Sequence, residues 1–301
     1  MKNLTRIMIP LGIALLVAIA LFAFKGRANG GLPSAAASSF DASKYISVVS
    51  REDGSGTRGA FIELFGVEVK GNDGSKKDMT AKEAIIANQT GVVITNVARD
   101  RYAVGYISLG SLSGAVKAVQ IEGIKATAGN VKNGTYPVAR PFNIATKGKA
   151  AGLAKDFIDF ILSADGQAVV AKSYIAVTDN APAYAGNKPS GKIAVAGSSS
   201  VTPVMEKLKE AYLAINPNAA IEIQESDSSA GMTATIDGTC DVGMASRGLK
   251  KSELEQLTPT QIAIDGIAVI VNNENPITNL TKEQVRLIYT SDALKWSDVS
   301  E

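Results

Sequence analysis

The 301-residue sequence contains no histidine and a single cysteine. Without histidine, the chain has no Ser-His-Asp or Cys-His nucleophile, no histidine proton shuttle and none of the usual catalytic zinc sites. One cysteine cannot form a disulfide within the chain. Cys240 stands in the small, apolar run 238–245, where we expect it to be buried rather than reactive. These absences exclude the commonest nucleophilic and zinc-dependent enzyme mechanisms, and we find no other cluster of metal ligands.

A marked excess of charge of either sign is also absent. The chain has 31 Lys and Arg against 29 Asp and Glu, a formal net charge of +2. A surface that binds nucleic acid normally needs a larger or more clustered positive charge, so we expect no nucleic-acid partner. What is present is a hydrophobic fraction of 46% and a charged fraction of 20%. These values are typical of a soluble protein with about two domains.

The first 29 residues differ from the rest of the chain. Lys2 and Arg6 precede an apolar run at 7–24, a pattern typical of an export signal. The run is also long enough to span a bilayer. Residues 1–29 are therefore either a cleaved export signal or an uncleaved membrane anchor, and a small, polar linker follows at 30–43. Both alternatives place the rest of the chain outside the cytoplasm, either anchored to the membrane or free in the periplasm or the medium.

Beyond residue 40, strand patterns alternate with helix patterns, which predicts an α/β fold with mostly parallel sheets. The stretch 180–192 is rich in Pro, Gly, Ala and Asn and predicts a linker. Two capping boxes predict helix starts at 252–255 and at 281–284. Strands are predicted at 45–50, 104–109, 116–121, 193–196, 221–224, 241–245 and 263–271. Helices are predicted at 81–88 and 153–162, beginning near 57 and 203, and after the turn that ends at 231.

Three Ser/Gly-rich turns each separate a predicted strand from a predicted helix, at 49–58, 196–203 and 224–231. A helix N-terminus exposes unpaired backbone N–H groups and carries a partial positive charge. Glycine lets the backbone approach a ligand, and serine and threonine hydroxyls add short donors, so such a turn can bind an anion. Ordinary helix capping explains any one of these turns. Three of them in one α/β chain favour an anion-binding site.

The first turn, Ser50–Arg58, reads SREDGSGTR. Arg51 can bind two oxygens of a tetrahedral oxyanion at once, and we expect Asp53 to hold its guanidinium in place. Arg58 faces either the anion or the solvent. The G-K-[ST] ending of a nucleotide P-loop is missing. Further hydrogen bonds to the anion are expected from the backbone and hydroxyl groups of Ser55, Gly56 and Thr57.

These residues closely resemble the central signature of the phosphate-binding proteins that serve ABC-type phosphate importers. The resemblance extends over nearly everything after residue 40. Three further motifs resemble the other phosphate loops of that family. They read GSSSVTP, QESDSSAG and DVGMASR, at Gly197–Pro203, Gln224–Gly231 and Asp241–Arg247.

The resemblance implies two Rossmann-like α/β lobes joined by a hinge, a periplasmic-binding-protein-like fold of type II with the ligand in the cleft. It implies inorganic phosphate as the ligand and the transmembrane subunits of an ABC permease as partners. It also implies a monomer with no cofactor and no enzymatic activity. The site residues that it implies are Arg51, Ser55, Gly56, Thr57, Ser199, Ser200, Ser228 and Ser246.

The motifs stand in an unusual order. Members of the family begin with the GSSSVTP region and reach the signature near mid-chain, whereas here the signature comes first. The sequence therefore resembles a circularly permuted member, with the former termini joined through 180–192. One lobe is then continuous, at 139–272, with crossings expected near 136–144 and 272–276. The other lobe combines 41–138 with 273–301. The alternative is that the chain is one stretch of a longer tandem protein.

The sequence leaves selectivity and role open. Phosphate carries a proton that sulfate lacks, and some family members accept it with an aspartate where this chain has Ser246. Asp227 or Glu225 can supply a carboxylate instead; otherwise sulfate or arsenate fits as well. Arg247 either faces the anion or pairs with an acid on the lobe surface. A membrane-tethered phosphate sensor or scaffold is an alternative to transport. A phosphatase is a further alternative, but no general base is evident.

Overall fold

The computed structural model describes residues 39–71 and 75–299. The predicted signal or anchor at 1–29 and most of the predicted linker at 30–43 lie outside the described residues. Within the described part, no helix is long and apolar enough to cross a membrane. The residues from Phe40 onward form one compact unit, to which the following description refers.

A mixed sheet of nine strands runs through this unit, in the order β10-β9-β11-β8-β12-β5-β1-β4, with β6 paired to β12. The parallel pairs lie toward its two ends, and the middle strands β8 and β12 run antiparallel to their neighbours. The expectation of mostly parallel sheets is therefore wrong for the centre. The strands are β1 (Ser47–Arg51), β4 (Ile85–Ala87), β5 (Ala103–Ser108), β6 (Lys117–Ala118), β8 (Ala139–Thr146), β9 (Gly191–Ser198), β10 (Ala219–Ser226), β11 (Val242–Ala245) and β12 (Thr258–Val271).

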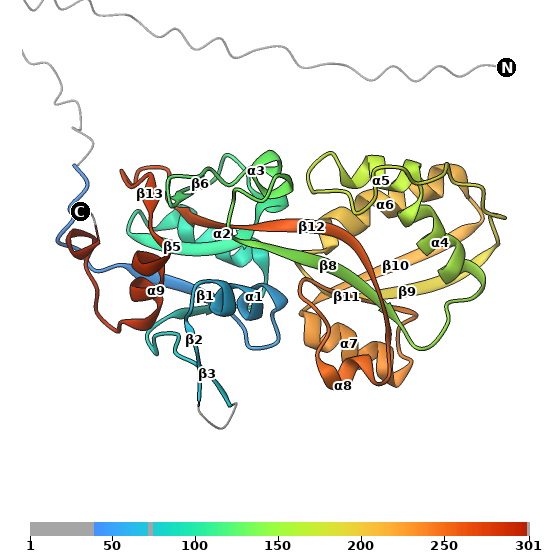
Figure 1. Ribbon diagram of the computed structural model, residues 1–301, viewed down its shortest axis with the longest axis horizontal. Helices are drawn as coiled ribbons and strands as arrows, with labels where there is room; N and C mark the ends of the chain where they lie inside the picture. Colours follow the sequence, from blue (N-terminus) through green and yellow to red (C-terminus); the bar gives the residue numbers. More distant parts are fainter. Residues whose placement is uncertain (1–38, 72–74, 300–301) are drawn as a thin grey trace, which may run out of the picture. The chain divides into compact units, whose positions relative to one another are not determined.

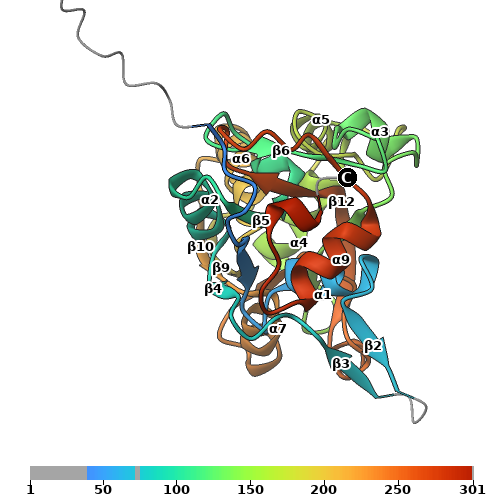
Figure 2. The same cartoon turned by 90° about the vertical axis from the view of Figure 1, so that its left-hand side faces the viewer.

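Helices pack around both ends of the sheet and divide the unit into two lobes (Figure 1). The first lobe holds α1 (Gly56–Leu64), α2 (Thr90–Arg99), α3 (Ala128–Lys132) and α9 (Lys282–Thr290). The second holds α4 (Gly152–Leu162), α5 (Ala164–Val170), α6 (Thr202–Ile215), α7 (Ser228–Asp237) and α8 (Lys251–Leu254). Two small sheets complete the first lobe: β7 (Gln120–Ile121) with β13 (Asn279–Leu280), and the hairpin of β2 (Glu68–Lys70) with β3 (Lys76–Asp78). Figure 2 shows this hairpin projecting from the lobe.

Each lobe has its own hydrophobic core, and β8 and β12 pass from one core to the other (Figure 1). On β12, Ala263 packs in the second core and Ile267 in the first. The passage therefore lies inside this strand and not at 272–276, where a crossing was expected. Asn272 belongs to the first lobe, because its side-chain amide donates to the carbonyls of Val97 (3.1 Å) and Ala98 (2.8 Å) on α2.

Three local signals in the sequence had different outcomes. At α9, the predicted capping box is confirmed: Thr281 accepts from the Gln284 N–H, and Gln284 from the Thr281 N–H. At α8, the box is shifted, because Glu253 accepts from the Lys250 N–H at 2.7 Å. The helix predicted at 81–88 is wrong, since this segment contains β4, which is held at the sheet edge by parallel pairing with β1.

The beginning and the end of the unit lie side by side (Figure 1). The Ile46 N–H donates to the Leu294 carbonyl at 2.8 Å, and the Ser297 N–H donates to the Ala42 carbonyl at 2.7 Å. Of the linker predicted at 180–192, residues 180–190 contain no helix or strand, and the last two residues already belong to β9. Residues 180–190 connect the end of the α5 region to β9, within the second lobe.

Asp156 fastens this connection to the lobe. Its side chain lies on α4 and is buried. The carboxylate accepts hydrogen bonds from the Tyr184 hydroxyl and the Asn187 N–H (3.0 Å) in the connection, and from the Tyr212 hydroxyl (2.6 Å) on α6. One buried acceptor thus joins two helices to a segment that has no regular structure of its own.

We expect Asp156→Ala to lower the free energy of unfolding by about 2–4 kcal/mol, because several buried donors lose their acceptor. Urea unfolding of the variant measures this. The matched control is Asp159→Ala on the same helix. Its exposed carboxylate pairs only with Lys155 in the structure, and its loss should cost less than about 0.5 kcal/mol. Similar small losses in both variants would show that the connection is not held by Asp156.

Candidate functional site

Arg51 lies at the end of β1 and is almost completely buried, with 2% of its surface exposed. Its Nε and Nη2 donate to the two carboxylate oxygens of Glu52, at 2.7 and 2.6 Å. Nη2 also reaches the Ser199 hydroxyl of the second lobe at 3.1 Å. The carboxylate that holds the Arg51 guanidinium is therefore that of Glu52. The expectation that Asp53 would hold it was wrong. Asp53 points into solvent and pairs with Arg58 at 3.2 Å.

Tyr106 fixes the backbone at this position. Its hydroxyl accepts from the Arg51 N–H at 3.0 Å and shares a hydrogen bond of 2.8 Å with the Ser50 hydroxyl. Its ring stacks on Phe61 of α1, with 3.8 Å between the ring centroids. Burial raises the pKa of Tyr106 to about 12, so the hydroxyl stays protonated near neutral pH. One buried side chain thus contacts both the end of β1 and the middle of α1.

Hydroxyl groups of the two lobes meet directly. Thr57 lies 2.7 Å from Ser200, oxygen to oxygen. Thr90, the first residue of α2, lies 3.2 Å from the Ser199 hydroxyl and 3.3 Å from that of Ser200, and it also accepts from Arg51 Nη1 at 3.3 Å. All of these side chains are buried, so the cleft is closed in this structure. Thr90 was missed from the sequence because α2 itself was not predicted.

Gly56 brings the two remaining motifs to the same place. A Cβ atom at this position would lie 2.5 Å from the Ser228 hydroxyl and 2.7 Å from the Ser246 hydroxyl. Ser246 donates its N–H to the Ser228 hydroxyl at 3.1 Å and accepts from the Ser198 hydroxyl at 2.9 Å. The structure thus places seven of the predicted residues together at one lobe interface: Arg51, Gly56, Thr57, Ser199, Ser200, Ser228 and Ser246.

The other predicted residues have different local contacts. The Ser55 hydroxyl caps α1, where it accepts from the Arg58 N–H at 3.3 Å. Asp227 caps α7 and accepts from the Ala230 N–H at 2.8 Å. Glu225 is exposed, and its partial burial raises its pKa more than the charge of Arg51 lowers it. In the part of the chain that the structure describes, we find no hydrogen bond from either carboxylate to a hydroxyl of the site.

Four helices begin at the site, namely α1, α2, α6 and α7, and none of them has an acidic residue in its first turn. Elsewhere the first turns are mixed: Asp165, Glu253 and Glu283 occupy those of α5, α8 and α9, whereas α3 and α4 have no acid there. The partial positive charge at the N-termini of α1, α2 and α6 is therefore not compensated by an acid in the first turn, whereas Asp227 caps α7. This arrangement favours an anion.

Full charges around the site are balanced in pairs. Besides Arg51 with Glu52, the structure contains the buried pair Arg140–Asp265, at 3.0 Å. Arg140 also donates to the Ser246 carbonyl at 3.2 Å. This pair was not predicted from the sequence.

Arg247 pairs with an acid of its own lobe. It donates two hydrogen bonds of 2.8 Å to the Glu253 carboxylate and one of 3.2 Å to the Ser229 hydroxyl. Of the two roles that the sequence left open, the structure shows the pairing. Burial raises the pKa of Glu253. The hydrogen bonds from Arg247 and from the Lys250 N–H together lower it by more, so the pKa lies below its ordinary value.

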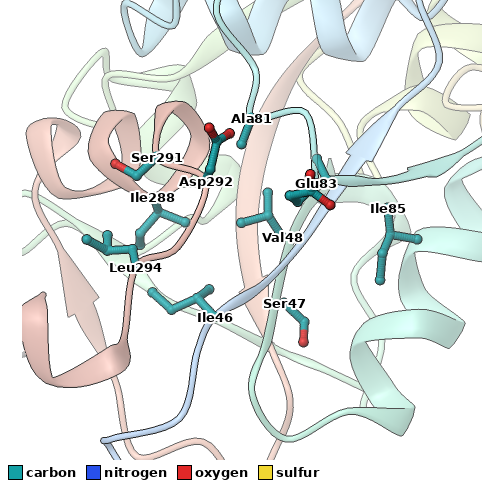
Figure 3. Close-up of a pocket in the computed structure, with 11 residues that line it drawn as sticks. Ile46, Ser47, Val48, Ala81, Glu83, Ile85, Ile288, Ser291, Asp292 and Leu294 are labelled. Carbon is teal, nitrogen blue, oxygen red and sulfur yellow. The ribbon is translucent and has the colours of Figure 1, made fainter.

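A small pocket of about 150 Å³ lies elsewhere in the first lobe, between the start of β1, the turn before β4 and the end of α9 (Figure 3). Apolar side chains line it together with the carboxyl groups of Glu83 and Asp292. None of the residues that line this pocket is a predicted site residue. They are Ile46, Ser47, Val48, Ala81, Glu83, Ala84, Ile85, Ile288, Ser291, Asp292 and Leu294.

Known proteins are similar to this chain in sequence and in fold. The profile of the family described as "PBP superfamily domain" matches residues 36–165 and 182–301. The chain is 54% identical to phosphate-binding protein PstS 2 of Streptococcus agalactiae over 258 residues, which are 85% of this chain and 88% of that protein. The crystal structure of a phosphate-binding protein of a phosphate ABC transporter from Streptococcus pneumoniae is 44% identical. It matches with a TM-score of 0.67 and covers 85% of this chain and 100% of its own.

The chain belongs to the phosphate-binding proteins of the PBP superfamily. The predicted family and the two-lobed, periplasmic-binding-protein-like fold are thereby confirmed. Other relatives match only one part of the chain. Phosphate-binding protein PstS of Bacillus subtilis is 36% identical over 137 residues, which are 44% of this chain and 42% of that protein.

We expect Glu253→Gln to destabilise the protein at pH 7 and to have a smaller effect at pH 3. The lowered pKa means that the pair with Arg247 stabilises the fold above about pH 4.5 and loses this contribution as the pH falls through the folded-state value. Glutamine can still accept from the Lys250 N–H, so the variant removes the charge and keeps the cap. Urea unfolding at both pH values measures the difference.

The matched control is Glu255→Gln, because Glu255 is exposed on the same short segment. Its effect should be small at both pH values. A loss of stability for Glu253→Gln that is equally large at pH 3 would contradict the assignment of the ion pair.

Proposed function

We propose that this protein binds inorganic phosphate in the closed cleft between its lobes and delivers it to the membrane subunits of an ABC-type phosphate importer. One observation carries the proposal: Arg51 and the hydroxyls of both lobes meet where four helices begin. The names of the relatives, which are phosphate-binding proteins, support the same ligand. They are named as binding proteins, and we propose binding without catalysis for this chain as well.

The chemistry of the site fits a small tetrahedral oxyanion. When phosphate leaves water, its oxygens need hydrogen-bond donors on every side. The first lobe offers the Arg51 guanidinium, the hydroxyls of Thr57 and Thr90 and the N-terminus of α1. The second offers the hydroxyls of Ser199, Ser200, Ser228 and Ser246 and the N-termini of α6 and α7. A ligand held by both sets favours the closed arrangement, because neither lobe alone can surround it.

Location and partners form the finer part of the proposal. We propose that the domain acts outside the cytoplasm, where an importer receives its substrate, and that residues 1–29 export it and either anchor it or are removed. We propose that it acts as a monomer. The basic and apolar pattern of that segment and the names of the relatives support this placement.

Calorimetric titration of the full-length chain with phosphate and with sulfate tests the ligand. We expect one phosphate per chain, and the titration with sulfate tests whether the site selects phosphate. Arg51→Lys keeps a positive charge but loses the two-pronged geometry, and it should weaken phosphate binding by about tenfold or more. No heat with either anion would refute the proposal. Equal affinity for both would refute selectivity alone and identify the site as a general oxyanion site.

We expect Gly56→Ala to weaken phosphate binding by at least about tenfold, because the added methyl group would collide with the Ser228 and Ser246 hydroxyls and hold the lobes apart. Gly59→Ala on the same helix is the matched control. Its Cβ would meet only Arg247 Cδ, at 4.0 Å, so binding should stay within about twofold. An equal effect of both substitutions would show that contact at Gly56 does not control binding.

A further inference from the structure

Arg140 and Asp265 form an ion pair on the two strands that join the lobes. They stand opposite each other in the register of β8 and β12. Arg140 donates from Nε and Nη2 to a single oxygen of Asp265, at 3.2 and 3.0 Å. Only 1% of either side chain is exposed. Two opposite charges are thus buried at the hinge, where backbone pairing already holds the strands together.

This ion pair reaches the proposed anion site through Ser246. The remaining arm of Arg140, Nη1, donates to the Ser246 carbonyl at 3.2 Å. The N–H and the hydroxyl of the same serine bond to Ser228 and Ser198 inside the site. Burial lowers the pKa of Arg140, the charge of Asp265 raises it, and the charge of Arg51 lowers it again. The charge of Arg51 thus opposes that of Arg140 within the protein interior.

A purely structural tie does not need charges here. Burying two ions is costly, and well-packed apolar residues often serve equally well. Charge does matter beside an anion site, because a buried positive charge attracts the ligand strongly where water does not screen it. An adjacent negative charge weakens that attraction.

We infer that Arg140 and Asp265 together set the affinity of the cleft for its anion: Arg140 adds positive potential on the Ser246 side, and Asp265 limits it. This rests on the proposed phosphate binding. The pair acts through its field and does not need to touch the ligand. Its consequence is that removing one charge and removing the other should shift the affinity in opposite directions.

Phosphate titration of three full-length variants tests the inference, with urea unfolding of each as a measure of stability. Arg140→Gln should weaken phosphate binding by about tenfold, and Asp265→Asn should strengthen it by about tenfold. Both should lower the free energy of unfolding, since each leaves a buried charge unpaired. The double variant, which removes both charges, should bind within about threefold of the unmodified chain.

A structural tie alone predicts affinity changes in the same direction for both single variants, or no change in either, and such a result overturns the inference. If a single variant does not fold, Arg140→Lys and Asp265→Glu keep the charges and should leave the affinity within about threefold. A tenfold loss of phosphate affinity in Arg140→Lys would then overturn the inference. An unmodified chain without phosphate affinity contradicts the proposed function itself, so the two failures are distinguishable.

Discussion

The close approach of the second lobe to the backbone of Gly56 is the constraint on which the site depends. At this position α1 begins, and the hydroxyls of Ser228 and Ser246 occupy the space that any side chain would need. The same approach brings Thr57 to Ser200. The hydroxyls of each lobe are buried by those of the other, so the site exists only where the lobes meet. The hinge strands β8 and β12 determine how the two lobes meet.

Electrostatics follow from that geometry. Helices α1, α2, α6 and α7 all present acid-free first turns to the interface, and the arginines nearby already have carboxylate partners. Such a cleft favours an anion mainly through fixed dipoles and hydroxyl groups. It therefore avoids a large uncompensated charge when it is closed, as it is in this structure. The balance between paired charges then becomes the feature that adjusts the affinity.

The sequence predicted what is encoded locally. The three strand-turn-helix motifs were recognised because donors, glycine and helix start lie within a few residues of one another. Contacts fixed by tertiary packing were not predicted. Thr90 joins the site only through α2, and the partner of Arg51 depends on which neighbouring side chain turns inward. The register that pairs Arg140 with Asp265 leaves no trace in either segment. The passage between the lobes on β12 comes before the limit predicted at 272, and the binding roles of individual residues remain predictions.

The permuted order of the segments also stays a prediction, and the structure explains why such an order is compatible with the site. The segments at 42–46 and 294–297 already lie hydrogen-bonded side by side, so a chain could run directly from one to the other. Each binding motif lies inside one lobe, away from 180–190. Changing where the chain begins therefore leaves the contacts between Gly56 and the serines intact, because those contacts depend on the packing of the lobes and not on the order in which they are connected.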